Sequence, residues 1–492
     1  MTASDIGRRQ VGRGPPDAVW LLVVVSVLVV LGGYVAVRAW VLSFTHDESL
    51  SYFGSIQAPL SSALLSRGTD ANNHPLNTLA MWLGDAVFGP REIALRWASL
   101  VAFVVYVVAL AVLLRRVERR SLRAFGLVLA VANPYVLDFF SLARGYGLAL
   151  ALVAASAFVT LDFVERPTAG RAMAATGFAA LAAFANFSTL TYFLAVLVVI
   201  VLAVRLPARN RPTGAAVARI AAAVSLPTLG VFLLVVLPLL RLRSAGELYF
   251  GGERGFWRDT AYSLVESTLY GRGWDVLAVV LVGLVAAMVV VGGAAAMRSI
   301  VRRRMPPHAT AFLLLTIPGL VSVAQHVVFG TRFLLGRTAL FFVPLLAIWL
   351  ALAGDAAARR LRFATAVTTG AVVIATAAVL NLVTAANSSY ALDWRYDAST
   401  ERVLSSLAGT GSEPRAVAVG VSFLFDPTTR FYRETRFRWL PECPSPDCLA
   451  QQADYYYVIG PDVALVRRRG ARIVRVYPVS GGVLARGAAR QG

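Results

Sequence analysis

The stretch Ser43-Phe44-Thr45-His46-Asp47-Glu48-Ser49 comes directly after an apolar run from Val19 to Leu42. A run of this length can cross the roughly 30 Å hydrocarbon layer of a membrane as a helix. Two adjacent carboxyl groups and a histidine then stand at a membrane surface, where charged residues are costly unless they are paired or face a wet cavity. The stretch therefore marks the end of a membrane span and, at the same point, a candidate functional site.

The remainder of the chain repeats the pattern of this first run. Of its 492 residues, 58% are hydrophobic and 15% are charged, which excludes a soluble globular protein. The first run is longer than the core of a cleavable signal peptide, so we expect it to stay as a membrane anchor. We predict an α-helical polytopic membrane protein with about eleven transmembrane helices, at residues 19–42, 94–114, 122–137, 144–164, 172–186, 190–205, 219–241, 275–297, 309–329, 337–353 and 363–385.

The net charge of +20 comes from arginines that cluster in every second loop, for example at 115–123 and 298–308. The positive-inside rule places such loops in the cytoplasm. The charge therefore requires no nucleic-acid partner, and we expect none. The N-terminal tail, residues 1–18, is then cytoplasmic. The first loop, residues 43–93, and the C-terminal region, residues 386–492, are extracytoplasmic, as in a multi-pass protein of the plasma membrane.

Asp47 and Glu48 are the candidate catalytic residues at the outer surface. A carboxylate in a cavity can take the proton of an attacking hydroxyl group, and burial would raise its pKa toward that task. Adjacent residues of a helix point about 100° apart. We therefore expect one acid to face the cavity and the other to brace a neighbouring arginine. The alternative is an ordinary solvated loop after the end of a helix.

Further outer residues are candidates for binding a substrate. In Asn72-Asn73-His74-Pro75, the histidine could donate to a phosphate or orient a carboxylate, although the asparagines and the proline alone would make a turn before an interfacial helix. Arg144 stands at a helix start, where a cation is misplaced unless it meets an anion such as a lipid phosphate, and Tyr146 could stack beside it. Arg332 and Arg337, near the outer ends of later spans, pose the same choice between a phosphate and snorkelling to lipid headgroups.

His46, Asp47, Glu48 and His74 could also be read as a metal site. Their spacing matches no compact ligand motif, and two of them can point away from the others. We therefore assign His46 and His74 to substrate binding and expect neither a metal nor a cofactor, with the metal site kept as the alternative.

The C-terminal region is too polar to continue the bundle and long enough for a small domain. We predict strands at residues 416–425, 454–460 and 472–478 and helices at residues 397–407, 427–436 and 462–469, which alternate as in a small α/β domain. Cys443 and Cys448 lie on the oxidising side of the membrane, where a disulfide is expected and two free thiols are the alternative. No nucleophile motif accompanies them, so a structural or acceptor-binding role is favoured over catalysis.

The order of these motifs resembles the GT-C superfamily of integral membrane glycosyltransferases. The residues that carry the resemblance are Asp47-Glu48 after the first span, His74-Pro75-Leu76, Ala94-Leu95-Arg96-Trp97-Ala98-Ser99, and Ser141-Leu142-Ala143-Arg144-Gly145-Tyr146-Gly147-Leu148-Ala149-Leu150. They are most similar to the family 39-like, protein-mannosyltransferase-related branch found in bacteria. The resemblance is specific over residues 19–165 and architectural over residues 166–385. Gly145 departs from it, because relatives often have a larger residue there.

The resemblance implies transfer of a sugar from a polyprenyl-phosphate-linked donor to a glycan, lipid or protein acceptor at the outer face of the membrane. It implies that Asp47 is the general base or an acid that positions the acceptor, with Glu48 beside it, and that Arg144 and Arg337 bind the lipid phosphate. Two other functions stay open. In a lipid or sugar transporter we would expect paired broken helices near the midplane and internal repeats. The sequence contains no repeat between its halves. A non-catalytic envelope scaffold would be supported mainly by the C-terminal domain.

Overall fold

A computed structural model describes residues 17–57, 59–65, 71–206, 212–359, 364–408, 417–441, 449 and 451–488. The chain divides into two compact units. The first comprises Met1–Tyr34, Ser99–Phe140 and Gly145–Ala386, and the second comprises Val35–Ala98, Ser141–Arg144 and Asn387–Gly492. The first loop and the C-terminal region thus belong to one unit, although they are far apart in the sequence.

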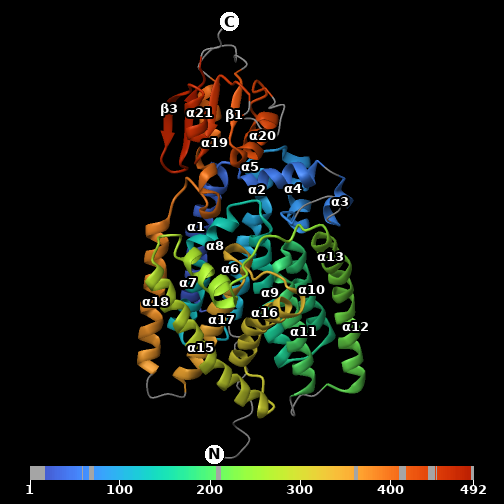
Figure 1. Cartoon of the computed structure of the whole chain (residues 1–492). Coiled ribbons are helices and arrows are strands. Elements are labelled where there is room, and N and C mark those ends of the chain that lie inside the picture. Colours follow the sequence, from blue (N-terminus) through green and yellow to red (C-terminus); the bar gives the residue numbers. More distant parts are fainter. Residues whose placement is uncertain are drawn as a thin grey trace, which may run out of the picture. The chain divides into compact units, whose positions relative to one another are not determined.

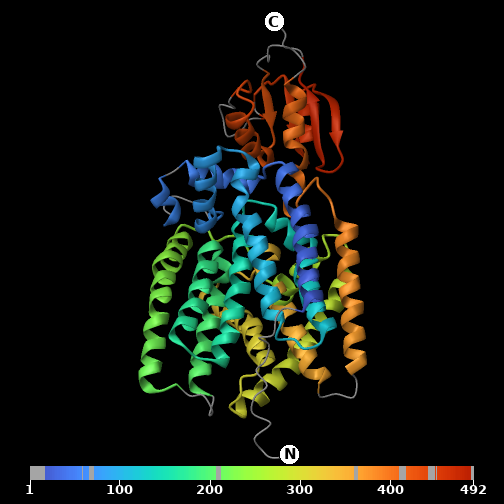
Figure 2. The ribbon, with the colours of Figure 1, turned by 180° about the vertical axis from the view of Figure 1, so that it is seen from behind.

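The first unit is a bundle of apolar helices (Figures 1 and 2). Eight helices of the described chain are long and apolar enough to cross a membrane, and a ninth span results if α7 and α8 count as one. Helices α10 and α17 are apolar but shorter. Every predicted span corresponds to a helix or helix pair, so the prediction of an α-helical multi-pass membrane protein is confirmed. The helices are α1 (Ala18–Val41, which ends in the second unit), α6 (Trp97–Leu114), α7 (Arg120–Val131), α8 (Pro134–Phe140), α9 (Gly145–Glu165), α10 (Ala169–Ala185), α11 (Leu190–Arg205), α12 (Gly214–Val231), α13 (Leu237–Ser244), α14 (Ser263–Thr268), α15 (Asp275–Val301), α16 (Pro307–Phe329), α17 (Phe342–Ala358) and α18 (Ala364–Ala385).

The predicted span at residues 122–137 is bent by 61° between α7 and α8. Pro134 has no amide proton to continue the helix, and the Asn133 side chain instead accepts the N–H groups of Tyr135, at 3.0 Å, and Val136, at 3.3 Å. A new helix, α8, therefore begins at Pro134, inside the predicted span.

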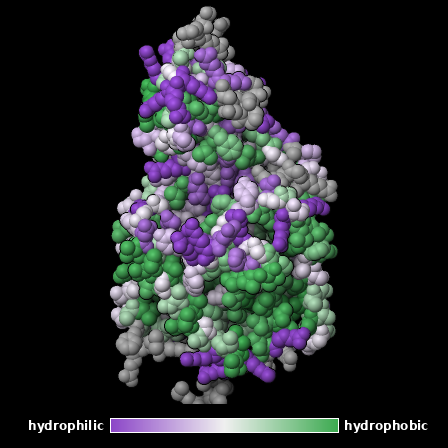
Figure 3. Space-filling model, in the orientation of Figure 1, coloured by the Kyte–Doolittle hydropathy of each residue, from purple (hydrophilic) through white to green (hydrophobic). Residues whose placement is uncertain are grey.

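Helix packing within the first unit depends on small residues, and its outer surface is apolar. Helix α7 packs against α17 and α18, and α9 packs against α10. A Cβ at Gly126 would lie 2.7 Å from the Cβ of Ala351, so the α7–α17 contact requires glycine there. Val276 and Val290 of α15 are 80% and 73% exposed, and Figure 3 shows the broad hydrophobic surface of this unit. Exposed aliphatic side chains on spanning helices are suited to contact with lipid.

The second unit contains short helices from the first loop: α2 (His46–Ser51), the π-helical turn η1 (Tyr52–Ile56), α3 (Leu60–Leu64), α4 (Pro75–Phe88) and α5 (Glu92–Leu95). Helix α4 begins at a proline, which suits the first position of a helix. Trp82, Val87 and Phe88 of α4 are exposed, as expected of a helix that lies along the membrane interface. A Cβ at Gly84 would come within 2.2 Å of the Ala94 carbonyl oxygen, so glycine permits α4 to pack against α5.

The C-terminal domain, from Asn387 onward, is a small α/β fold as predicted. Its sheet has the order β1-β2-β4-β3, with β1 parallel to β2 and the other pairs antiparallel. Strand β4 is missing from the sequence prediction although it pairs with both β2 and β3. The elements of the C-terminal domain are the 3₁₀ segment η6 (Leu392–Ser399), α19 (Thr400–Leu407), β1 (Val419–Val421), η7 (Phe423–Phe425), α20 (Asp426–Thr435), β2 (Tyr455–Val458), α21 (Asp462–Arg468), β3 (Arg472–Tyr477) and β4 (Gly482–Arg486). Cys443 and Cys448, and with them the predicted disulfide, lie outside the described residues.

One hydrophobic core joins the first loop to the C-terminal domain within the second unit. Its buried members from the loop and its flanks include Phe44, Met81 and Leu95, and those from the C-terminal domain include Phe431 and Tyr432. The rings of Phe44 and Phe431 stack with centroids 4.0 Å apart. The candidate site at Asp47 is thus built on a core to which both regions contribute.

Candidate active site

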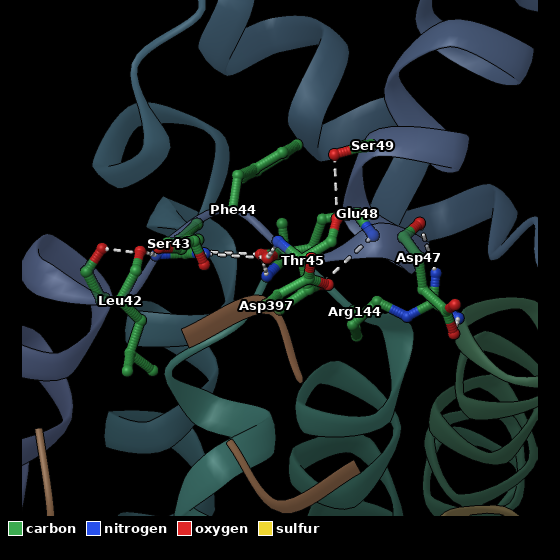
Figure 4. A network of polar contacts seen from close by, with 12 residues as sticks. Leu42, Ser43, Phe44, Thr45, Asp47, Glu48, Ser49, Arg144 and Asp397 are labelled. Carbon is green, nitrogen blue, oxygen red and sulfur yellow. Dashed lines mark hydrogen bonds and ion pairs between the residues drawn. The ribbon is translucent and has the colours of Figure 1, made fainter. Parts of the chain in front are cut away.

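Helix α2, which carries the two candidate acids, begins in a capping box. The Thr45 hydroxyl accepts the Glu48 amide N–H at 3.3 Å, and the Glu48 carboxylate accepts the Thr45 N–H at 2.9 Å. These reciprocal bonds satisfy two amide donors at the start of the helix. The pattern Thr45-His46-Asp47-Glu48 therefore sets where α2 starts and which way Glu48 points (Figure 4).

Glu48 is saturated by hydrogen bonds inside the protein. Its carboxylate accepts Nε of Arg96 at 2.9 Å and Nη2 of Arg96 at 2.8 Å, together with the N–H groups of Ala143 at 2.6 Å and Thr45 at 2.9 Å. An ionised carboxylate offers about four acceptor positions, so all are occupied. Both side chains of the Glu48–Arg96 pair are 0% exposed.

Arg96 is saturated in the same way. Besides Glu48, its guanidinium donates to the carbonyl oxygens of Ala39 at 3.0 Å, Leu42 at 2.9 Å and Ser43 at 3.1 Å. These carbonyls lie at and just after the end of α1, where helices leave carbonyl groups without helical partners. Arg96 thus caps α1 and holds α2 through Glu48.

These contacts keep Glu48 ionised. Burial alone would raise the pKa of Glu48, but the charge of Arg96 and the hydrogen bonds from Arg96, Ala143 and Thr45 outweigh it, so the pKa lies below its ordinary value. A saturated, ionised carboxylate that is closed to solvent is suited to hold structure. Of the two roles expected for the adjacent acids, Glu48 has the geometry of the bracing one.

Asp47, unlike Glu48, is partly open to solvent. Its carboxylate lies 3.4 Å from Nη2 of Arg144, and its side chain is 14% exposed, whereas Arg144 is 1% exposed (Figure 4). Arg144 Nη1 also donates to the Asp47 backbone carbonyl at 3.1 Å. The Arg144 guanidinium carbon lies 5.9 Å from the ring centroid of Trp394, within the range of a cation–π contact. Asp47 is therefore the carboxylate that solvent or a substrate can reach, with a buried cation beside it.

Asn72 and Ser51 complete the surroundings of this pair. Asn72 donates to the Asp47 carbonyl at 3.0 Å, and its side-chain oxygen accepts Nη2 of Arg144. The Ser51 hydroxyl accepts Arg144 Nη1 at 3.0 Å and donates to the Asp47 carbonyl at 2.9 Å. The turn that the sequence predicts at Asn72 thus lies against the candidate base.

The two predicted histidines of the second unit differ in their surroundings. His46 Nδ1 lies 2.9 Å from the carbonyl oxygen of Leu424 in the C-terminal domain. Because a carbonyl oxygen only accepts, Nδ1 carries the proton in this contact. His74 is buried at the residue preceding α4, two residues after Asn72, which contacts Asp47.

The other candidates belong to the first unit. Tyr146 is buried in the first turn of α9 and packs against Phe139, with ring centroids 4.7 Å apart. Arg332 forms a largely exposed ion pair with Glu253 at 2.9 Å. The Arg337 guanidinium lies over the ring of Phe250 at 4.9 Å from its centroid.

The residues around the site that were not among the sequence candidates include Arg96, Asn72 and Asp397. Arg96 and Asn72 stand inside motifs that carry the family resemblance or the predicted turn, and their polarity next to apolar helices was the available signal. Asp397 lies in the C-terminal domain and accepts the His46 N–H at 2.7 Å, a contact that no local pattern reveals. Within the described ranges, no group of three or more His, Cys, Asp or Glu side chains is placed to hold a metal ion.

Comparison with known proteins identifies the fold. No family model matches the chain, and no curated protein matches it in sequence. Among solved structures, apo ArnT from Cupriavidus metallidurans matches with a TM-score of 0.54 and 14% identity, covering 96% of this chain and 98% of that one. ArnT from the same organism bound to undecaprenyl phosphate matches with a TM-score of 0.51 and 15% identity, covering 96% and 99%. The chain therefore shares the fold of ArnT over nearly its whole length, which is the fold that the resemblance of its motifs implies.

Proposed function

We propose that this protein is a membrane glycosyltransferase that moves a sugar from a polyprenyl-phosphate-linked donor to the hydroxyl group of a glycan, lipid or protein acceptor. The observation that carries the proposal is the Asp47–Arg144 pair, an accessible carboxylate beside a buried guanidinium. The fold supports it, because the solved structures that share it include ArnT bound to undecaprenyl phosphate. Fold alone does not determine function, so the proposal rests on the geometry of the site.

In the proposed reaction, Asp47 accepts the proton of the acceptor hydroxyl group while the oxygen of that hydroxyl group attacks the anomeric carbon. The bond from that carbon to the phosphate oxygen breaks, and the polyprenyl phosphate leaves with the electron pair. The configuration at the anomeric carbon is inverted. The departing phosphate gains negative charge, which a preorganised cation stabilises. We assign this task to Arg144, beside the base, and to Arg337, with His46, His74, Tyr146 and Arg332 as further substrate-binding candidates.

We infer the sidedness of the protein from its arginine-rich loops. We place the N-terminus and these loops in the cytoplasm and the second unit, with Asp47, outside the plasma membrane. The loop between α6 and α7 supports this placement, because it is rich in arginine and includes Arg115, Arg116 and Arg119. The donor would then react at the outer surface, with its lipid tail in the membrane.

The test uses purified protein in lipid nanodiscs with polyprenyl-phosphate-linked mannose, glucose, arabinose and aminoarabinose. Release of polyprenyl phosphate and transfer of labelled sugar are measured for each donor. We expect one donor to react and Asp47→Asn to abolish the reaction. Asp85→Asn is the matched control, because Asp85 lies on α4 of the same unit and its Oδ1 is buried with no hydrogen-bond partner among the described residues. It should react like the wild type.

Two results would overturn the proposal. Full activity of Asp47→Asn, with the variant folded, would remove Asp47 as the base. Neither release nor transfer with any donor, together with movement of a lipid-linked sugar between leaflets, would identify a transporter instead.

A further inference from the structure

Two of the three residues that precede Asp47, Phe44 and His46, are held by the C-terminal domain. The Phe44 N–H donates to the Tyr432 hydroxyl at 2.8 Å, and the His46 N–H donates to Asp397 Oδ2 at 2.7 Å. The His46 ring adds the contact to the Leu424 carbonyl at 2.9 Å. The donors lie within three residues of each other, whereas their acceptors come from η6, η7 and α20.

These hydrogen bonds lie in a dry environment. Phe44 and Tyr432 are 0% exposed, and Asp397 is 1% exposed. The stacked ring of Phe431 covers Phe44. A backbone N–H buried in such surroundings has no water to replace a lost partner, so removal of its acceptor leaves an unsatisfied donor. The backbone at Phe44 and His46 is therefore tied to one position.

Asp397 is an unusual residue to bury here. It forms no ion pair with any described residue, in contrast to Asp47 and Glu48. Burial raises the pKa of Asp397 well above its ordinary value, which the N–H of His46 partly opposes and the charges of Asp47 and Glu48 reinforce. Burial of a carboxyl group without a cation costs stability, and the hydrogen bond from the His46 N–H offsets part of that cost.

We propose that the C-terminal domain is part of the catalytic apparatus, in which Asp397 and Tyr432 are positioning residues that fix the backbone leading into Asp47. The inference rests on the proposed role of Asp47 as base. Asp397 holds the residue directly before Asp47, and Tyr432 holds the residue two positions before that one. Arg144 and Asn72 hold Asp47 from its other side. A displacement of about 1 Å at a reacting group can lower a rate by about 100-fold.

The activity test compares variants that keep the acceptor with variants that remove it. Asp397→Asn keeps an oxygen for the His46 N–H and should retain activity within about threefold of the wild type. Asp397→Ala removes it and should lower kcat by about 100-fold, and Tyr432→Phe should lower kcat by about tenfold. Donor KM should change by less than about threefold in each case, because the two cations assigned to the donor phosphate, Arg144 and Arg337, are unchanged.

The controls remove the same groups elsewhere in the domain. Asp454→Ala removes a carboxylate that accepts the Ala418 N–H at 2.9 Å. Tyr477→Phe removes a buried hydroxyl that has no hydrogen-bond partner among the described residues. Both should leave kcat and KM unchanged.

A second readout does not depend on catalysis. Hydrogen exchange measured by mass spectrometry should show that peptides covering residues 44–51 lose protection in Asp397→Ala and Tyr432→Phe but keep it in the two controls. If the wild type transfers no sugar, the proposed function fails, and this measurement still decides whether the domain fixes the segment.

The outcomes separate positioning from a general structural role. Wild-type kcat in Asp397→Ala, or unchanged exchange at residues 44–51, would overturn the inference. Equal loss of activity in Asp397→Ala and in the controls would also overturn it, because the domain would then act only through its overall stability.

Discussion

Glu48 and Arg96 form a fully buried ion pair in which the hydrogen-bonding groups of both side chains are used within the second unit. Through Arg96 the pair holds the end of α1, and through the Ala143 N–H it holds the short segment Ser141–Arg144. That segment carries Arg144, the partner of Asp47. The closed Glu48–Arg96 pair thus positions the accessible Asp47–Arg144 pair.

Glu48→Gln should destabilise the protein strongly. The amide keeps the size of the side chain but leaves the Arg96 guanidinium buried without a countercharge, a change that costs about 3–5 kcal/mol in other proteins. We expect a large drop in apparent melting temperature, measured by tryptophan fluorescence in detergent. Arg430→Ala is the control, because the Arg430–Glu434 pair is largely exposed and its loss should change stability by less than about 1 kcal/mol. Wild-type stability of Glu48→Gln would contradict the role assigned to the pair.

Arg144→Lys should remove most activity although it keeps the positive charge. The Arg144 guanidinium contacts Asp47, Ser51 and Asn72 at once, and an ammonium group cannot reproduce this planar set of donors. We expect kcat to fall by about 100-fold or more, with a much smaller change in melting temperature than for Glu48→Gln. Arg395→Lys, at an exposed contact to the Val479 carbonyl, is the control. Activity of Arg144→Lys near the wild-type level would show that charge alone suffices at this position.

Local patterns predicted the membrane helices and much of the C-terminal domain. Apolar runs of spanning length are decisive within a short window, so each predicted span corresponds to a helix or helix pair. Strand β4 escaped prediction because its sequence, Gly-Val-Leu-Ala-Arg, begins with glycine and contains only one β-branched residue, although its pairing with two neighbours makes it central. The capping box of Thr45 and Glu48 was present in the sequence and would have indicated that Glu48 points back toward the start of its own helix.

The partners of the candidate site could not be predicted in the same way. Arg96 lies 48 residues from Glu48, and Arg144 lies 97 residues from Asp47. Asp397 lies 351 residues from His46. These pairs are decided by how separate segments pack, which periodicity and spacing do not record. The sequence therefore indicated which residues are chemically unusual but not which of the two adjacent acids is accessible.

Gly84→Ala should destabilise the first-loop helices. The added methyl group would meet the Ala94 carbonyl oxygen at 2.2 Å and the Trp97 ring at 3.0 Å, so α4 and α5 would have to separate. Overpacking of this kind costs about 1–3 kcal/mol, and peptides covering residues 75–97 should exchange hydrogen faster. Gly54→Ala is the control within the same unit, because nothing lies within 4 Å of its added carbon. Equal behaviour of the two variants would show that the α4–α5 contact is looser than described.

The pH dependence of stability should report the buried Asp397 carboxyl group. Its pKa is raised well above the ordinary value of 3.8, so between that value and the raised one the folded state binds a proton that the unfolded state releases. The contribution of Asp397 to stability is therefore largest at low pH and declines as the pH rises through this interval. Asp397→Asn cannot titrate, so its stability relative to the wild type should increase as the pH rises above about 4. Melting temperatures measured across this range test the expectation. The curve for Asp454→Asn, which changes an exposed carboxylate, should run parallel to that of the wild type, and a parallel curve for Asp397→Asn would show that Asp397 is ionised in the folded protein.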